Sequence, residues 1–163
     1  MIDTNYDLLN QQAHALIATE TDLLANLSNS AALLFHSLGD VNWAGFYLGR
    51  DPELILGPFQ GQPACVRIEY GKGVCGAAAK SQEILRVDDV HEFPGHIACD
   101  AASNSEIVLP LLINGICYGV LDIDSPSSHR FTEADEAGLT KFRNILMAVI
   151  AESLAAYRPW SSD

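Results

Sequence analysis

The chain has 163 residues, with 9 Lys and Arg against 21 Asp and Glu and a formal net charge of -12. This charge repels phosphate backbones and anionic lipid, so neither nucleic acid nor a membrane is expected as a partner. The length and the 48% apolar content fit one folded domain. Because no signal-peptide pattern and no membrane-length apolar run occur, we expect a soluble, cytoplasmic protein.

The first half of the chain predicts helices followed by strands. Apolar residues at helical spacing over residues 3–38 predict two helices, or one helix broken near residue 20. Residues 41–50 and 53–59 predict two strands of a hairpin, because β-branched and aromatic residues flank a polar turn. Residues 64–76 predict a strand that leads into a glycine-rich turn, and residues 77–82 then predict a short helix.

The second half predicts more strands and a closing helix. Residues 84–90 predict a short strand, and a long loop follows it. Residues 106–115 and 116–125 predict an antiparallel hairpin with Asn114 and Gly115 in its turn, and Pro110 favours an edge strand or a bulge. Thr132 and Asp135 have capping-box spacing at the start of a last helix, which Pro159 is expected to end.

This order predicts an α+β fold, in which an antiparallel sheet carries the N- and C-terminal helices on one face. We expect one domain over residues 1–163. Within it, residues 1–39 form the helical segment, residues 40–130 the sheet and the active-site loops, and residues 132–157 the last helix.

Four cysteines without a CxxC pair are too few for a disulfide scaffold, and they are expected to be packing, metal-binding or reactive residues. Cys99 follows His96 by three residues in a polar loop. An imidazolium at His96 would lower the pKa of the Cys99 thiol and favour a nucleophilic thiolate. The same loop could instead hold a metal through His91, His96, Cys99 and Cys75, but this spacing matches no structural zinc pattern.

Strand alternation places Asp122 and Asp124 on one face of residues 116–125 and Cys117 on the other. The two carboxylates indicate either an acidic pocket, which Glu106 could join, or a strand end that emerges into solvent. In a pocket, two close carboxylates would raise one pKa and leave a proton donor beside a cation-binding group. Cys117 is expected to be a small buried hydrophobic residue.

The same alternation places Trp43, Gly45 and Tyr47 on one face of residues 41–50. Gly45 would leave room between the two rings for an apolar or cationic group. Ordinary packing of the two aromatic rings is the alternative.

Three motifs, FQGQPACVRIEYGKGVCGAAA, RVDDVHEFPGHIACDAASNSEIVLPL and GVLDIDS, resemble the free methionine-R-sulfoxide reductases, which are built on the GAF fold. The resemblance covers roughly residues 43–135. It implies that Cys99 is the nucleophilic cysteine and that Cys65 and Cys75 are the other redox cysteines. It also implies a substrate pocket formed by Trp43, Tyr47, Glu106, Asp122 and Asp124.

The resemblance further implies reduction of free L-methionine (R)-S-oxide through a sulfenic acid on Cys99 and an intramolecular disulfide. Cys65 is the first choice as the resolving cysteine and Cys75 the second. Thioredoxin would regenerate the thiols, and neither a metal nor an organic cofactor is expected. Apolar faces on the terminal helices leave a homodimer open. The competing interpretation is a sensory GAF module that binds a small ligand without turnover.

Overall fold

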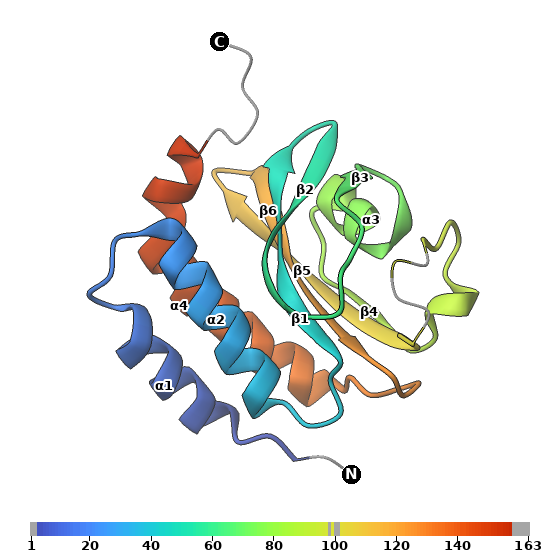
Figure 1. Cartoon of the computed structure of the whole chain (residues 1–163), viewed down its shortest axis with the longest axis horizontal. Coiled ribbons are helices and arrows are strands. Elements are labelled where there is room, and N and C mark those ends of the chain that lie inside the picture. The colour runs from blue at the N-terminus through green and yellow to red at the C-terminus, as the bar shows by residue number, and fades with distance from the viewer. Residues whose placement is uncertain (1–2, 98, 100–101, 158–163) are drawn as a thin grey trace.

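A single antiparallel sheet organises the protein, which we describe from a computed structural model covering residues 3–97, 99 and 102–157. The strands lie in the order β3-β2-β1-β6-β5-β4, so both predicted hairpins pair as neighbours (Figure 1). The six strands are β1 (Trp43–Arg50), β2 (Glu53–Gly61), β3 (Arg67–Glu69), β4 (Leu85–Val87), β5 (Ser105–Ile113) and β6 (Ile116–Ser125).

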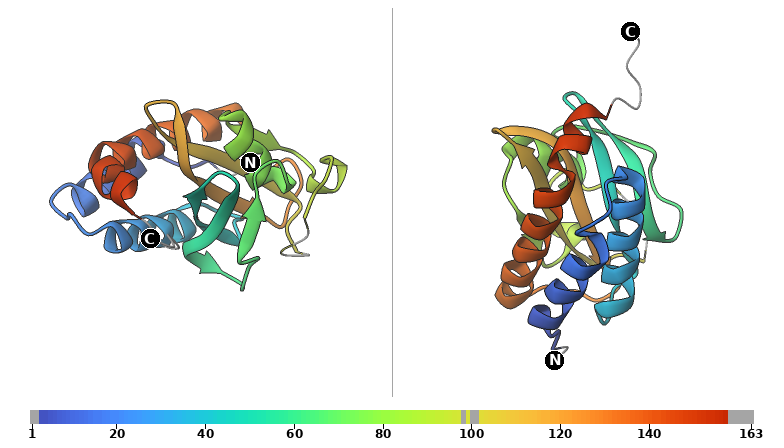
Figure 2. Two further views of the ribbon diagram at one scale, coloured as in Figure 1. Left: turned by 90° about the horizontal axis from the view of Figure 1, so that it is seen from above. Right: turned by 90° about the vertical axis from the view of Figure 1, so that its left-hand side faces the viewer.

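Three helices, α1 (Tyr6–Ile17), α2 (Leu23–Ser37) and α4 (Glu133–Ala156), lie on one side of the sheet; α2 and α4 pack on the strands, and α1 packs on these two helices (Figures 1 and 2). They bury the larger core against alternate residues of the central strands, such as Phe46 and Leu121. The shorter helix α3 (Gly73–Ser81) packs on the opposite face and forms a second, smaller core there. The predicted α+β fold with the terminal helices on one face is therefore confirmed.

The ends of the long helices follow local capping rules. Asn5 and Asp22 cap α1 and α2 through their side chains, and residues 3–38 form two helices, which is one of the two predicted arrangements. Thr132 and Asp135 form the predicted capping box of α4. Pro159, expected to end this helix, lies outside the described residues. None of the helices that the structure describes is both long and apolar enough to cross a bilayer.

A bulge in the β5–β6 hairpin corrects the predicted position of Cys117. Asn114 and Gly115 form the turn with positive φ values of 50° and 76°. Further along, Pro110 pairs with Val120 but Leu112 pairs with Cys117, so β6 carries one extra residue there. This extra residue reverses the side-chain alternation, and Cys117 belongs to the smaller core with Val120 rather than to the opposite face. Cys117 is nevertheless buried, as predicted.

The space beside Gly45 is filled by the protein itself. An added Cβ at Gly45 would collide with the Cβ of Phe59 on the neighbouring strand β2. The Phe59 ring stacks on Trp43 with the ring centroids 5.1 Å apart. The prediction of room for a ligand between Trp43 and Tyr47 is therefore wrong, because a cross-strand neighbour occupies that room.

Candidate active site

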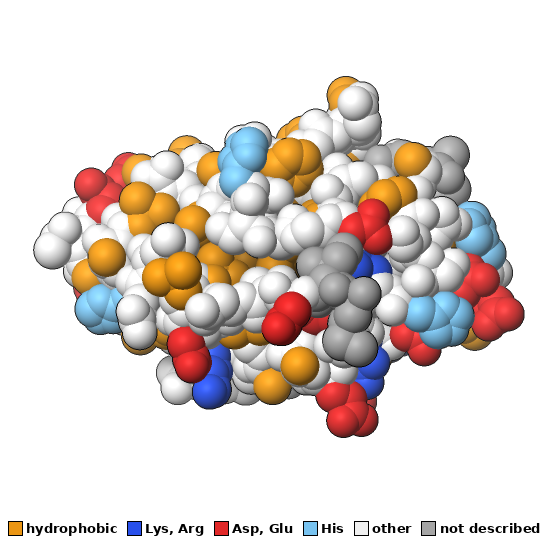
Figure 3. Space-filling view, turned by 90° about the horizontal axis from the view of Figure 1, so that it is seen from below, with side chains coloured by type: hydrophobic (Ala, Val, Ile, Leu, Met, Phe, Trp, Pro, Cys, Tyr) orange, Lys and Arg blue, Asp and Glu red, His pale blue; other side chains and the backbone are white. Residues whose placement is uncertain are grey.

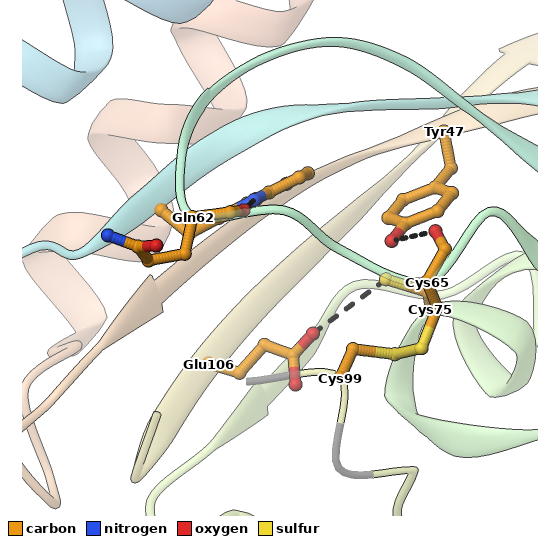
Figure 4. Close-up of a disulfide and its surroundings, with 7 residues drawn as sticks. Tyr47, Gln62, Cys65, Cys75, Cys99 and Glu106 are labelled. Atoms are coloured by element: carbon orange, nitrogen blue, oxygen red, sulfur yellow. Dashed lines mark hydrogen bonds between the residues drawn. A yellow bond between two sulfur atoms is a disulfide. The ribbon is translucent and has the colours of Figure 1, made fainter. Parts of the chain in front are cut away.

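Cys65 and Cys99 form a disulfide, which joins two loops at one end of the sheet (Figure 4). Cys65 lies between β2 and β3, and Cys99 lies between the short 3-10 helix η1 (Val90–Glu92) and β5. The two residues are 34 positions apart in the sequence, and their Cα atoms are 5.3 Å apart. Both side chains are half-buried, so the bond lies close to the surface. The sequence left Cys65 and Cys75 as candidate partners of Cys99, and in the structure Cys99 is bonded to Cys65.

The cavity beside this disulfide is lined by residues from five segments that are distant in the sequence. The lining residues predicted from the sequence are Trp43, Tyr47, Cys75, Cys99, Glu106, Asp122 and Asp124. Alternation on β1 and on the end of β6 brings the aromatic rings and the carboxylates to this face. The alternative in which the strand simply emerges into solvent does not hold, because Asp122 is 5% exposed and Asp124 is half-buried in the cavity lining.

The carboxylates form one acidic group, because β5 and β6 pair Glu106 with Asp124 and place Asp122 two residues before Asp124. Glu106 and Asp122 are buried and Asp124 is half-buried. Burial, and after it the nearby Asp124 carboxylate, raises the pKa of Asp122 to about 8. Burial also raises the pKa of Glu106 well above its ordinary value, and Asp122 adds to the effect. Near neutral pH the cavity therefore contains protonated carboxyl groups that can donate a proton.

One oxygen of this group is unsatisfied. Among the described residues, Asp122 Oδ1 is buried and has no hydrogen-bond partner. A buried polar atom without a partner costs about 1–3 kcal/mol. This cost is removed when a ligand group that can donate a hydrogen bond or carries positive charge enters the cavity.

Cys75 is buried and lines the cavity, with its side chain directed at Glu106 (Figure 4). Its Sγ donates a hydrogen bond to Glu106 Oε1 at 3.7 Å. Burial, and then the charge of Asp122, raises the pKa of the Cys75 thiol. The structure therefore holds Cys75 as a neutral thiol beside the carboxyl groups, with little thiolate available for attack.

Two aromatic rings form the apolar side of the cavity. Trp43 and Tyr47 are each 2% exposed, and their rings stack with centroids 5.9 Å apart. Tyr47 donates its hydroxyl hydrogen bond to the backbone carbonyl of Cys65, at 2.9 Å. The cavity thus has an apolar wall on β1 next to the acidic group on β6 and β5, because Trp43 pairs directly with Asp124. The disulfide lies at the edge of the cavity.

The histidines do not form the expected activating or metal-binding group. His96 lines the cavity, but partial burial and then His91 lower its pKa, which disfavours an imidazolium beside Cys99. His91 Nε2 instead lies 3.0 Å from Asn104 Oδ1. Within the described part of the chain, the one group of three metal-type donors is Cys75, Glu106 and Asp122, which differs from the predicted set.

Sequence reasoning missed Ser103, which is 6% exposed and lines the cavity just before β5. It also missed the apolar residues that complete the lining, Ala64, Ile68, Val74 and Ile97. The only sequence signal for these lining residues was that small and apolar residues lie next to the cysteine motifs. This signal is weak, because ordinary core residues are of the same types. Their role becomes visible only when the loops are placed over the sheet.

The sequence and fold match known proteins over most of their length. The GAF domain model matches residues 12–150. The free methionine-R-sulfoxide reductase of Escherichia coli (strain K12) is 56% identical over 146 residues, which cover 90% of this chain and 88% of that protein. The chain belongs to the free methionine-R-sulfoxide reductases, a family of GAF domain proteins.

Two solved structures of this family superpose closely on the fold. The fRMsr of Staphylococcus aureus in complex with substrate is 50% identical with a TM-score of 0.87, covering 92% of this chain and 99% of that chain. The free methionine-R-sulfoxide reductase of Neisseria meningitidis in complex with its substrate is 44% identical with a TM-score of 0.88, covering 93% and 92%.

Proposed function

We propose that this protein reduces free L-methionine (R)-S-oxide to methionine by thiol chemistry. The observation that carries the proposal is the Cys65–Cys99 disulfide at the edge of a cavity that contains Glu106, Asp122 and Asp124. A redox-active thiol, a proton donor and a binding group for an amine are the three elements that this reaction needs. The E. coli relative, named for the same activity, supports the assignment.

In the first step the Cys99 thiolate attacks the sulfoxide sulfur, and a protonated carboxyl group of the acidic cluster delivers a proton to the sulfoxide oxygen. The oxygen is transferred to the Cys99 sulfur, which becomes a sulfenic acid, and the substrate is released as the thioether methionine. Asp122 is suited to donate this proton because its pKa of about 8 keeps it protonated at neutral pH. The reaction therefore oxidises one thiol and reduces one sulfoxide.

In the second step the Cys65 thiol condenses with the sulfenic acid, which gives the disulfide and one water molecule. Thioredoxin, a dithiol reductant, then restores both thiols by exchange. The half-buried position of Cys65 and Cys99 supports direct access by such a protein. We place the cycle in the cytoplasm, where a reducing environment keeps the remaining thiols Cys75 and Cys117 free.

The cavity also accounts for selection of the free amino acid. Trp43 and Tyr47 would contact the S-methyl group, while the ionised carboxylate of the acidic cluster would pair with the substrate ammonium. A methionine sulfoxide inside a polypeptide has an amide in place of this ammonium. The buried carboxylate would then be left unpaired, at a cost of several kcal/mol.

A coupled assay with thioredoxin, thioredoxin reductase and NADPH tests the proposal. We expect NADPH consumption that depends on free methionine (R)-sulfoxide and yields an equal amount of methionine. Cys99→Ser should abolish it, and a peptide containing methionine sulfoxide should be a poor substrate. Binding of methionine sulfoxide without any reductant consumption would instead identify a sensory module and refute the proposal.

A further inference from the structure

The segment that carries Cys65, residues 62–66, has little regular structure of its own. It runs from the end of β2 to the start of β3, and Val66 at its end is 61% exposed. The Val66 carbonyl accepts a backbone hydrogen bond from the Leu56 N–H at 2.9 Å. Such a segment needs other contacts to hold a thiol in one place.

Two buried aromatic side chains of β1 provide these contacts. Trp43 donates its Nε1–H to the Gln62 carbonyl at 3.2 Å, and Tyr47 donates its hydroxyl to the Cys65 carbonyl at 2.9 Å. Figure 4 shows the Tyr47 hydroxyl directed at the carbonyl of the residue that forms the disulfide. Because both rings are buried and stacked, the two donors are held in fixed positions.

We propose that the Tyr47 hydroxyl is a positioning group for the resolving thiol of Cys65. This inference rests on the proposed function, in which Cys99 becomes a sulfenic acid. The Cys65 sulfur then bonds to the Cys99 sulfur, the S–O bond of the sulfenic acid breaks, and the hydroxyl leaves as water with the Cys65 proton. The Tyr47 hydrogen bond holds the Cys65 backbone at the distance from Cys99 that this condensation requires.

The two steps of the reaction separate this role from substrate binding. Formation of methionine requires Cys99 and the cavity but no contribution from Cys65. Formation of the disulfide requires Cys65 to be within reach, and small displacements of a reacting group cause large losses in rate. A fault in positioning should therefore slow the second step alone and prolong the life of the sulfenic acid.

Tyr47→Phe removes the hydroxyl and keeps the ring, and Tyr70→Phe is the matched control. Tyr70 also donates its hydroxyl to a cysteine carbonyl, that of Cys117 at 3.3 Å, but it does not line the cavity. Each reduced variant is mixed with one equivalent of methionine sulfoxide. Quenched samples are then assayed for methionine, for the Cys65–Cys99 disulfide, and for a dimedone adduct on Cys99.

For Tyr47→Phe we expect the rate constant of disulfide formation, divided by that of methionine release in the same sample, to fall roughly two- to tenfold relative to the wild type, with more dimedone adduct. The ratio isolates the second step, because a lost contact with the substrate would slow the release of methionine itself. The Tyr70→Phe variant should match the wild type in all three measurements. Trp43→Phe, which removes the donor to Gln62 and keeps an aromatic ring, should show the same pattern as Tyr47→Phe. It provides the test if Tyr47→Phe does not fold.

Disulfide formation at the wild-type rate, with normal release of methionine, would overturn the positioning role and leave Cys99 as the nucleophile. Equal slowing of both steps would also overturn it, because Tyr47 would then act through the substrate alone. Absence of methionine even with the wild-type protein would refute the proposed function itself.

Discussion

Asp122→Asn is expected to make the protein less active and, at neutral pH, more stable. Asp122 is 5% exposed, and its Oδ1 has no hydrogen-bond partner among the described residues. Folding therefore places this carboxyl where its charged form is disfavoured, beside Glu106 and Asp124. Asparagine has nearly the same shape and no charge, so the substitution removes the electrostatic cost and also removes the proposed proton donor.

The expected magnitude follows from the pKa of Asp122, which is about 8 in the folded chain against an ordinary value of 3.8. Between these values the folded protein keeps a proton that the unfolded chain releases, so the stability falls as the pH rises. One such proton corresponds to about 1.4 kcal/mol per pH unit, or about 2.7 kcal/mol from pH 5 to pH 7. Because Glu106 competes for the proton, we expect the wild type to lose about 2 kcal/mol more than Asp122→Asn over this range.

Urea unfolding of the reduced proteins at pH 5, 6 and 7 measures this difference. Glu83→Gln is the reference variant, because it removes one carboxylate at an exposed position. The reductase activity of Asp122→Asn should fall by about 100-fold or more, the range expected for loss of a general acid. Parallel stability curves for the wild type and Asp122→Asn would refute the argument from burial, whatever the activity shows.

Three further predictions concern other parts of the chain. Cys117→Ser should keep wild-type reductase activity, because Cys117 lies five residues from Asp122 along β6, about 16 Å away. A strong loss of activity in the coupled assay would instead place Cys117 in the reaction. Gly45→Ala should destabilise the protein by about 1–3 kcal/mol in thermal unfolding, because its Cβ would collide with Phe59; an unchanged melting temperature would contradict this. Sedimentation velocity should detect a homodimer, and a species of 17.6 kDa alone would argue against it.

The homodimer prediction depends on apolar surface outside the site. Leu8, Leu16 and Leu24 on the helical side are 49%, 44% and 48% exposed. Figure 3 shows hydrophobic side chains gathered on the lower face of the molecule, on the side that carries these helices. Acidic side chains are more numerous than basic ones on the same face, which agrees with the net charge of -12.

The fold could be predicted where local chemistry determines it. The capping box of α4, the Asn114–Gly115 turn and the alternation of β1 each depend on residues close together in the sequence. Apolar periodicity then indicates which faces meet in the core. These local rules were sufficient to predict the order of the elements. On β1, alternation alone also placed Trp43 and Tyr47 on the face that lines the cavity.

The errors arose where one segment's conformation depends on a distant partner. The bulge in β6 exists because of its pairing with β5, so simple alternation placed Cys117 on the wrong face. The space beside Gly45 is taken by Phe59, which a strand considered alone does not reveal. The choice between Cys65 and Cys75 as the partner of Cys99 likewise required the relative position of two loops.

The location of the disulfide explains how a rigid sheet can carry a redox cycle. Cys65 and Cys99 both lie on connecting segments, whereas the carboxylates and aromatic rings of the cavity project from paired strands. Opening and closing the Cys65–Cys99 bond therefore requires adjustment of loops and leaves the strand pairing of β1, β5 and β6 intact. The binding groups can stay in place through the cycle, and the hydrogen bonds from Trp43 to Gln62 and from Tyr47 to Cys65 tie the cysteine segment to the same rigid strand.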